Sequence, residues 1–173
     1  QYSEAVNRVP GVYVQRGSGE ESLVAIRSPV LTGAGACGAF LVAEDGLATR
    51  PVGFCNVNDM FELNTEQAAG IEVYRGPGPA IYGASAVHGI INVRTPWVAE
   101  LPRFGIGLEG GPDNYRRARL AAGAHNERRG IGAYGLSTHD GGFPPDSGYN
   151  EGKLCPYYPS TPAADLPRAS PVG

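Results

Sequence analysis

Within residues 104–108 and again within residues 118–124, apolar residues recur at every second position, and this alternation constrains the fold more than any other feature of the sequence. A period of two predicts β-strands with one apolar face and one small or polar face. The turn at residues 110–114 separates two such runs, and a third, less regular run covers residues 129–137. In water the apolar face would cover a core, as in an ordinary soluble hairpin, which the pattern alone favours; in an outer membrane it would face lipid. The apolar positions are Phe104, Ile106, Leu108, Ala118, Leu120, Ala122 and Ala124.

The segments on either side have different patterns. Residues 1–96 contain short β-type runs, such as Val12–Val14 and Ile90–Val93, with short helical signals between them, which predicts a compact α+β unit. Residues 97–150 predict two to three strands. Residues 151–173 contain several prolines without a periodic apolar pattern, so we expect an extended or disordered tail.

Composition excludes several classes of protein. The chain has 14 Lys and Arg against 17 Asp and Glu, and no dense basic cluster, which argues against nucleic-acid binding. No apolar run reaches the length of about 18 residues that a membrane-spanning helix needs. A G-x-G-x-x-G run at residues 33–38 is followed by a β-type run instead of a helix, and the loop at residues 78–83 lacks the lysine of a phosphate loop. The histidines lack the spacing of a metal site. We therefore expect no enzyme, no metal site and no cofactor.

The chain has 3 cysteines. In an oxidising compartment Cys37 and Cys55 form the natural pair, because both lie in loop-like surroundings, and Cys155 is left over. A disulfide closing such a loop would stabilise the fold by about 3 kcal/mol. Two free buried thiols are the alternative.

The most informative stretch runs from Ile71 to Val93 and reads IEVYRGPGPAIYGASAVHGIINV. It resembles the end of the plug domain of TonB-dependent outer-membrane receptors, whose pattern is I-E-V-x-R-G-P, then x-Y-G, a small residue and x-G-x-I-N-V. Upstream segments resemble other plug motifs in the same order over roughly residues 5–96. They are Val9–Val12 for the opening V-P-G-V, Ala25–Arg27 for the I-R-G strand, Asp45–Gly46 for the D-G turn, and Asn56–Leu63 for the short helix.

This resemblance implies an α+β fold: a small mixed-sheet plug domain at residues 1–96, followed at residues 97–150 by antiparallel hairpin strands of an incomplete transmembrane β-barrel. It favours lipid over a soluble core as the neighbour of the apolar face. It implies a place in the bacterial outer membrane, with the plug facing the periplasm and the barrel lumen. The implied partners are a TonB-type energy-coupling protein, a small-molecule nutrient such as a siderophore or vitamin, and the membrane itself, without nucleic acid.

The resemblance also assigns structural or gating roles to the motif residues. Glycines permit tight turns and close backbone approach. Arg27 and Arg75 are expected to pair with acidic residues of the inner barrel wall, for which a planar guanidinium is suited; solvent-exposed arginines are the alternative. The motif residues are Arg27, Asp45, Gly46, Glu72, Arg75, Gly76, Pro77, Tyr82, Gly83, Gly89 and Asn92.

The sequence departs from the family pattern in two places. Ser28 stands where I-R-G has its glycine, and no energy-coupling box is recognisable in residues 1–7. In the family, plug loops point outward and help to form the ligand site, which implies candidate ligand loops at residues 28–38 and 47–55. Their composition does not identify a substrate. The candidate contacts are Ser28, Thr32, Ala36, Arg50 and Phe54.

Length sets a last expectation. The resemblance implies a barrel of about 22 strands, each of about 9–11 residues, which requires far more chain than residues 97–173 supply. The chain starts at Gln1 and has its only methionine at Met60, so we expect a processed or truncated, transport-incompetent piece of a receptor. The alternative is a stand-alone periplasmic or secreted ligand-binding module built on the plug fold.

Overall fold

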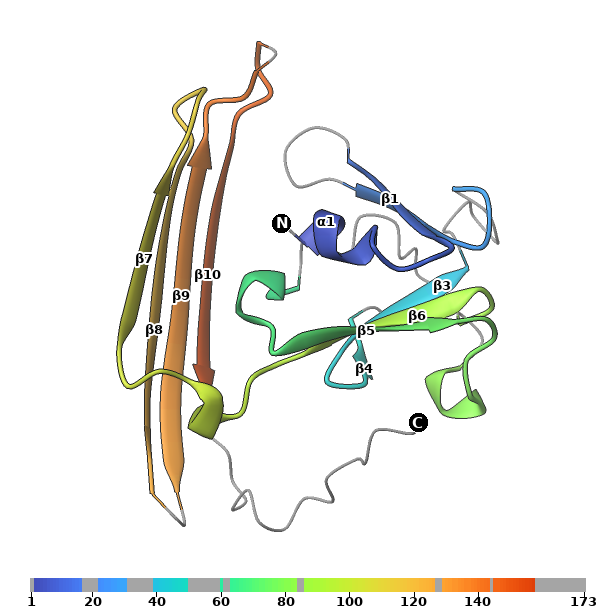
Figure 1. Ribbon diagram of the computed structural model, residues 1–173, viewed down its shortest axis with the longest axis horizontal. Helices are drawn as coiled ribbons and strands as arrows, with labels where there is room; N and C mark the ends of the chain where they lie inside the picture. Colours follow the sequence, from blue (N-terminus) through green and yellow to red (C-terminus); the bar gives the residue numbers. More distant parts are fainter. Residues whose placement is uncertain are drawn as a thin grey trace. The chain divides into compact units, whose positions relative to one another are not determined.

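The computed structural model describes residues 2–16, 22–30, 39–49, 60, 63–83, 86–126, 129–143 and 145–157. The chain divides into two compact units, residues 1–95 and residues 96–173, and each is described here by itself. Figure 1 labels their elements. Within the described residues, no helix combines the length and the apolar character needed to cross a membrane.

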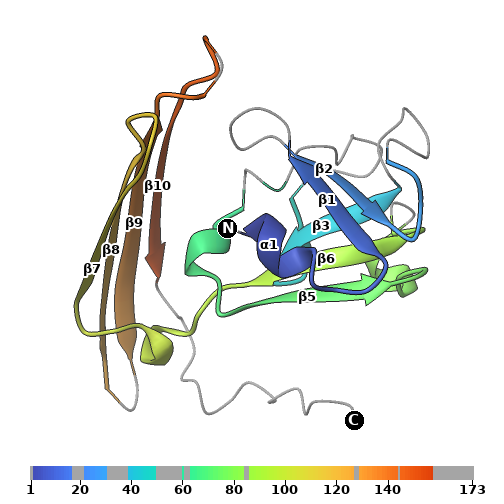
Figure 2. The same ribbon diagram turned by 45° about the horizontal axis from the view of Figure 1, so that its top comes forward.

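The described residues of the first unit form two β-layers and a short helix (Figure 2). Helix α1 (Tyr2–Val6) leads into an antiparallel pair of strands, β1 (Val12–Arg16) and β2 (Ser22–Ile26). A four-stranded sheet has the order β4-β3-β6-β5, in which β3 and β6 are parallel and the other pairs antiparallel. The predicted small mixed sheet is therefore confirmed. Its strands are β3 (Phe40–Glu44), β4 (Leu47–Ala48), β5 (Gly70–Arg75) and β6 (Gly89–Arg94), with 3-10 turns η3 (Thr65–Gln67) and η4 (Ala80–Tyr82) between them.

Both faces of the two central strands are buried. Phe40 and Val42 of β3 face the β1–β2 pair and pack with Ile26, whereas Leu41 points to the opposite face and packs with Ile90. Strands covered on both faces require nearly continuous apolar runs, because successive side chains point to opposite sides. The sequences FLVA in β3 and GIINV in β6 meet this requirement.

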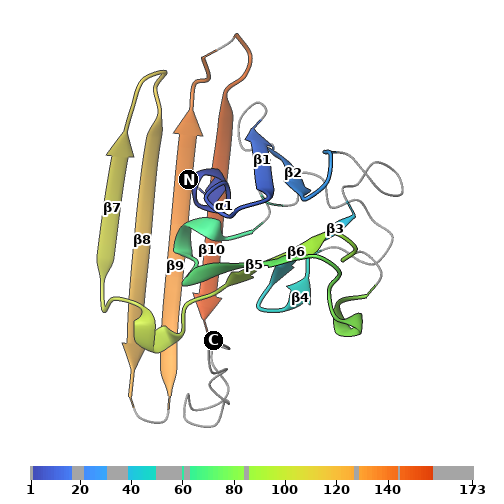
Figure 3. The same cartoon turned by 45° about the vertical axis from the view of Figure 1, so that its right-hand side comes forward.

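The second unit is an antiparallel sheet with the order β10-β9-β8-β7, preceded by the short turn η5 (Val98–Glu100) (Figure 3). One face carries exposed apolar side chains, among them Leu108, which is 75% exposed, and Leu154, which is 77% exposed. The other face carries Arg117, Tyr134 and Thr138, which are buried. We call the first the outward face and the second the inward face. The strands are β7 (Gly105–Gly110), β8 (Arg116–His125), β9 (Gly130–Asp140) and β10 (Tyr149–Tyr157).

Strand β10 corrects the expectation for the tail. Residues 151–157, part of the segment expected to be extended or disordered, form a strand paired with β9. Its outward positions are Asn150, Gly152, Leu154 and Pro156, so the apolar periodicity is weak even though burial alternates along the strand. Proline is tolerated because β10 is at the edge of the sheet. Residues 158–173 lie outside the described residues.

Candidate functional site

Three plug motifs that are far apart in the sequence meet beside the end of β5. The Nη1 of Arg75 donates a hydrogen bond to the Pro10 carbonyl oxygen at 2.9 Å, and the Arg27 N–H donates to the Gly11 carbonyl oxygen at 2.8 Å. Gly11 has a φ of 81°, and a Cβ there would come within 3.2 Å of the Arg27 Cγ. The V-P-G-V, I-R and R-G-P segments therefore form one cluster. Arg75 reaches a main-chain carbonyl in it, and its expected pairing with barrel acids stays a prediction, as does that of Arg27.

The glycines of the cluster allow β5 and β6 to approach closely. The Gly76 N–H donates to the His88 carbonyl oxygen at 2.8 Å, and Gly76 has a φ of 112°, in the left-handed half of conformational space that favours glycine. Gly89 is paired with Arg75 across the hairpin, and a Cβ on Gly89 would overlap the carbonyl oxygen of Tyr74. Tyr82 packs against the apolar cluster formed by Leu41, Ala86 and Ile90. Pro77 and Gly83 lie in the same connection between β5 and β6, where Gly83 has a φ of 76°.

A second cluster surrounds the β3–β4 turn at the other end of the sheet. Asp45 and Gly46 have φ values of 50° and 80°, the pair of positive angles that a two-residue hairpin turn requires. The Gly46 N–H donates to Asn92 Oδ1 at 2.8 Å, and Asn92 Nδ2 donates to Glu72 Oε2 at 3.0 Å. The Asn92 side chain is buried, and both its amide oxygen and its amide nitrogen have hydrogen-bond partners, as buried polar atoms generally do. Three motif residues, Gly46, Asn92 and Glu72, thus form one hydrogen-bonded chain, and Asp45 directly precedes Gly46 in the turn.

Asp45 also ties this turn to the residues after β6. Its N–H donates to the Val93 carbonyl oxygen at 2.9 Å, and its carboxylate accepts hydrogen bonds from the N–H and the hydroxyl of Thr95. Neither Thr95 nor Arg94 belongs to a plug motif. The sequence could indicate them only by their position directly after the I-N-V motif.

Glu72 sets the electrostatics of the cluster. Its carboxylate lies 3.5 Å from the Arg94 Nε, and it accepts a hydrogen bond from the Tyr74 hydroxyl at 3.4 Å. Side chains two positions apart on a strand share a face, which brings Glu72 and Tyr74 together. The negative charge of Glu72 is the main cause that raises the pKa of the Tyr74 phenol above its usual value, and burial adds to it.

This raised pKa gives a prediction for stability at high pH. Below pH about 10, the ordinary tyrosine pKa, the phenol is protonated in both the folded and the unfolded chain. Above it the unfolded chain loses its proton first, so folding stability falls as the pH rises through the folded-state pKa. We expect Glu72→Gln to lower the Tyr74 pKa and to weaken this loss. NMR titration of ring-labelled tyrosines, compared with Tyr13 as an exposed control, measures the shift; an unchanged Tyr74 pKa in the variant would contradict the assignment.

The candidate ligand loops are described only in part. Ser28 is half-buried, and its Oγ is buried without a hydrogen-bond partner among the described residues. The other candidate contacts, the Cys37–Cys55 pair and most of the predicted helix at residues 56–63 lie outside the described residues. These assignments therefore stay predictions. The predicted residues that lie outside the described part of the chain are Thr32, Ala36, Arg50, Phe54, Cys37 and Cys55.

The described residues hold no group of three or more His, Cys, Asp or Glu side chains placed to bind a metal ion. The two clusters consist of turn-forming glycines, buried amides and charge-assisted hydrogen bonds. They can lock the β5–β6 hairpin to the segments around it.

Comparison with known families decides what this arrangement belongs to. The model of the TonB-dependent receptor plug domain matches residues 1–90, more than half of the chain. The chain belongs to the TonB-dependent receptor plug family. The resemblance carried by the motifs is thereby confirmed, and this is a family of outer-membrane receptors and transporters, not of enzymes.

A solved structure extends the likeness beyond the plug. The copper transporter OprC matches with a TM-score of 0.61 at 18% sequence identity, over 91% of this chain and 25% of OprC. This chain therefore spans about a quarter of the length of that relative. At this identity the likeness shows the fold alone: a plug followed by barrel strands.

Proposed function

We propose that residues 1–96 are the gate of a receptor that takes up a scarce nutrient across the bacterial outer membrane, and that residues 97–150 begin its barrel. The nutrient would be a siderophore, a vitamin or a comparable small molecule, and the energy would come through a TonB-type protein acting on the full-length receptor. The observation that carries the proposal is the meeting of the plug motifs in two clusters at opposite ends of the β5–β6 hairpin. A gate needs hydrogen-bonded clusters at both ends of its central hairpin, because it must move or open without losing its own fold.

The roles of the motif residues follow from these clusters. Arg75 and Arg27 lie at one end of the hairpin, and Asp45 and Asn92 lie at the other. We assign them the task of keeping the sheet intact while the loops at residues 28–38 and 47–55 contact the ligand. Contacts of the two arginines with acids of the barrel wall would then hold the plug in place.

The second candidate function is a soluble ligand-binding module. It would require a layer over the outward face of β7–β10, where Ile106 is 67% exposed and Leu108 is 75% exposed. None of the described residues of the second unit covers these side chains, which favours a lipid neighbour over water.

Charge placed on the outward face tests this choice. We expect Leu108→Arg to weaken the association of the chain with phosphatidylcholine vesicles by about 2–4 kcal/mol if the position lies near the bilayer centre, because a cation there must leave water. The matched control is Asp113→Arg in the β7–β8 turn, where the effect should be small. Flotation with vesicles measures the bound fraction. A wild-type chain that stays monomeric in the aqueous phase would support the soluble module.

The nutrient itself requires a binding screen on the full-length receptor. Ferric siderophores and cobalt-containing vitamins form two arms, and Cu²⁺ forms a third because OprC is named as a copper transporter. Binding that survives substitution of Arg50 and Phe54 would argue against the assigned ligand loops.

A further inference from the structure

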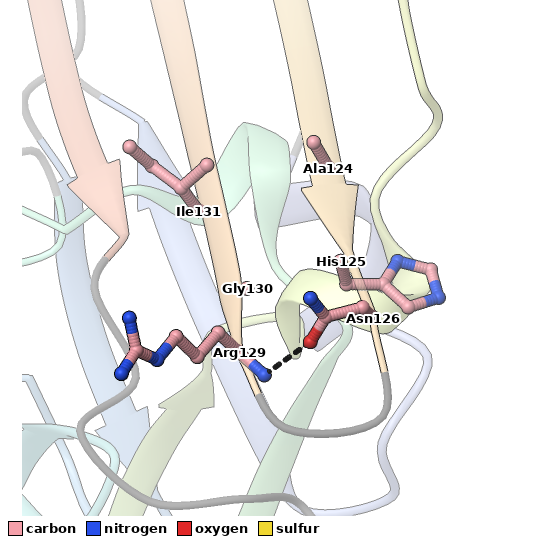
Figure 4. Close-up of a pocket in the computed structure, with 6 residues that line it drawn as sticks. All are labelled: Ala124, His125, Asn126, Arg129, Gly130 and Ile131. Carbon is pink, nitrogen blue, oxygen red and sulfur yellow. Dashed lines mark hydrogen bonds between the residues drawn. The ribbon is translucent and has the colours of Figure 1, made fainter.

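A shallow pocket of about 420 Å³ lies at the β8–β9 turn (Figure 4). The turn is closed by two hydrogen bonds: the Arg129 N–H donates to Asn126 Oδ1 at 2.7 Å, and the Asn126 N–H donates to the Arg129 carbonyl oxygen at 2.8 Å. These bonds fix the backbone from which the Arg129 side chain leaves the turn. The remaining turn residues, Glu127 and Arg128, lie outside the described residues.

The pocket has a polar part and an apolar part. The polar part holds His125, Asn126 and Arg129, and Figure 4 shows the Arg129 and His125 side chains leaving opposite sides of the turn. The Arg129 side chain is exposed and has no ion-pair partner among the described residues. The apolar part is formed by Ala124 and Ile131, which are paired directly across β8 and β9 on the outward face. The pocket therefore joins an exposed cation, without an ion-pair partner among the described residues, to the end of an apolar surface.

The position of the turn in the sheet fits the boundary of a membrane. The β8–β9 connection, residues 126–129, is shorter than the β9–β10 connection at the other end, residues 141–148. Short turns of outer-membrane barrels face the periplasm, and longer loops face the exterior. Trp97 lies at the same end, because the next residue, Val98, is so close to Gly130 that a Cβ there would come within 3.0 Å of the Val98 Cγ1. Tryptophan is enriched at the level of the lipid headgroups.

We propose that this pocket binds the headgroup of an anionic phospholipid in the periplasmic leaflet. The Arg129 guanidinium donates hydrogen bonds to the lipid phosphate, a charge-assisted contact for which its planar fork is suited. Ala124 and Ile131 contact the first carbons of an acyl chain. A free phosphate ion would leave this apolar part uncovered, which is why the pocket fits a lipid. This inference rests on the proposed place of β7–β10 in the outer membrane.

Trp97 is the only tryptophan of the chain and can report on the lipid beside the pocket. The full 173-residue chain would be placed in neutral detergent micelles containing brominated phosphatidylglycerol or brominated phosphatidylcholine, each of which quenches nearby tryptophan fluorescence. We expect phosphatidylglycerol to be preferred by about fivefold, the effect of one arginine at an anionic lipid surface. Arg129→Gln should reduce this preference to near parity. Arg116→Gln removes an exposed arginine from the opposite end of β8 and should leave it unchanged.

The outcomes distinguish the proposed headgroup site from the proposed position of β7–β10 in the membrane. Strong and equal quenching by both lipids in the wild-type chain would overturn the headgroup site and leave the membrane position of the sheet intact. An equal loss of preference in the Arg116→Gln and Arg129→Gln variants would also overturn it, because the preference would then reflect net charge. Absence of quenching by either lipid would overturn both the headgroup site and the proposed place of the sheet in the membrane.

Discussion

Replacing Gly89 with alanine is expected to lower the free energy of opening the β5–β6 hairpin by about 3 kcal/mol, the upper range of single substitutions. The new Cβ would overlap the carbonyl oxygen of Tyr74 and lie 3.0 Å from two carbons of Ile26. Neither neighbour can yield easily. Tyr74 is held by its strand pairing, and Ile26 is fully buried in the core. The backbone must therefore separate at the Arg75–Gly89 pair, which lies next to the Arg75–Pro10 hydrogen bond.

Hydrogen exchange of the β5 and β6 amides measures this effect, because a loss of about 3 kcal/mol accelerates exchange through opening by roughly a hundredfold. Gly152→Ala is the matched control, since no atom lies within 4 Å of its new Cβ. There the change should be slightly stabilising, because alanine restricts the unfolded chain more than glycine does. Wild-type protection of β6 in the Gly89→Ala variant would show that the close approach of the two strands is not required.

Most strands of the first unit could be predicted, with β4 the exception, because their residues carry the information locally. The apolar runs of β3 and β6 are continuous, since both faces of these strands are buried. Similarly, the alternation in β7 and β8 follows from one exposed and one covered face. Strand β10 was missed because Leu154 is the one large apolar residue among its outward positions, which also include Pro156. Pairing with β9, and not local pattern, makes it a strand.

The positions of the plug motifs could be recognised in the sequence, but their partners could not. The partner of the Arg75 guanidinium is the carbonyl oxygen of Pro10, a main-chain atom that no side-chain pattern reveals. The Asp45 carboxylate binds Thr95 across the sheet, and this contact depends on how β3 and β6 are aligned. A motif therefore identifies the residue type at a position, whereas the atoms that this residue contacts are known only from the folded structure.

Asn92→Asp is expected to destabilise the second cluster by about 3 kcal/mol. The buried Asn92 amide donates to Glu72 and accepts from the Gly46 N–H, so its two ends have different tasks. A carboxylate keeps the acceptor for Gly46 but replaces the donor with a second negative charge 3.0 Å from Glu72 Oε2. Two carboxylates at that distance cannot both stay ionised at low cost, so one must bind a proton. Denaturation of the full chain at several pH values should therefore show that the variant recovers stability as the pH falls.

The double variant Asn92→Asp/Glu72→Gln separates charge repulsion from loss of the hydrogen bond. A glutamine at position 72 carries no charge and has an amide that can donate to the introduced carboxylate, which reverses the direction of the original bond. We expect it to recover more than half of the lost stability and to remove the added pH dependence. If Asn92→Asp alone is as stable as the wild-type chain at neutral pH, Glu72 and Asn92 do not form this partly buried hydrogen bond. If the double variant recovers nothing, charge repulsion is not the cause of the loss, and the hydrogen-bond geometry of the Asn92 amide holds the β3–β4 turn against β5 and β6.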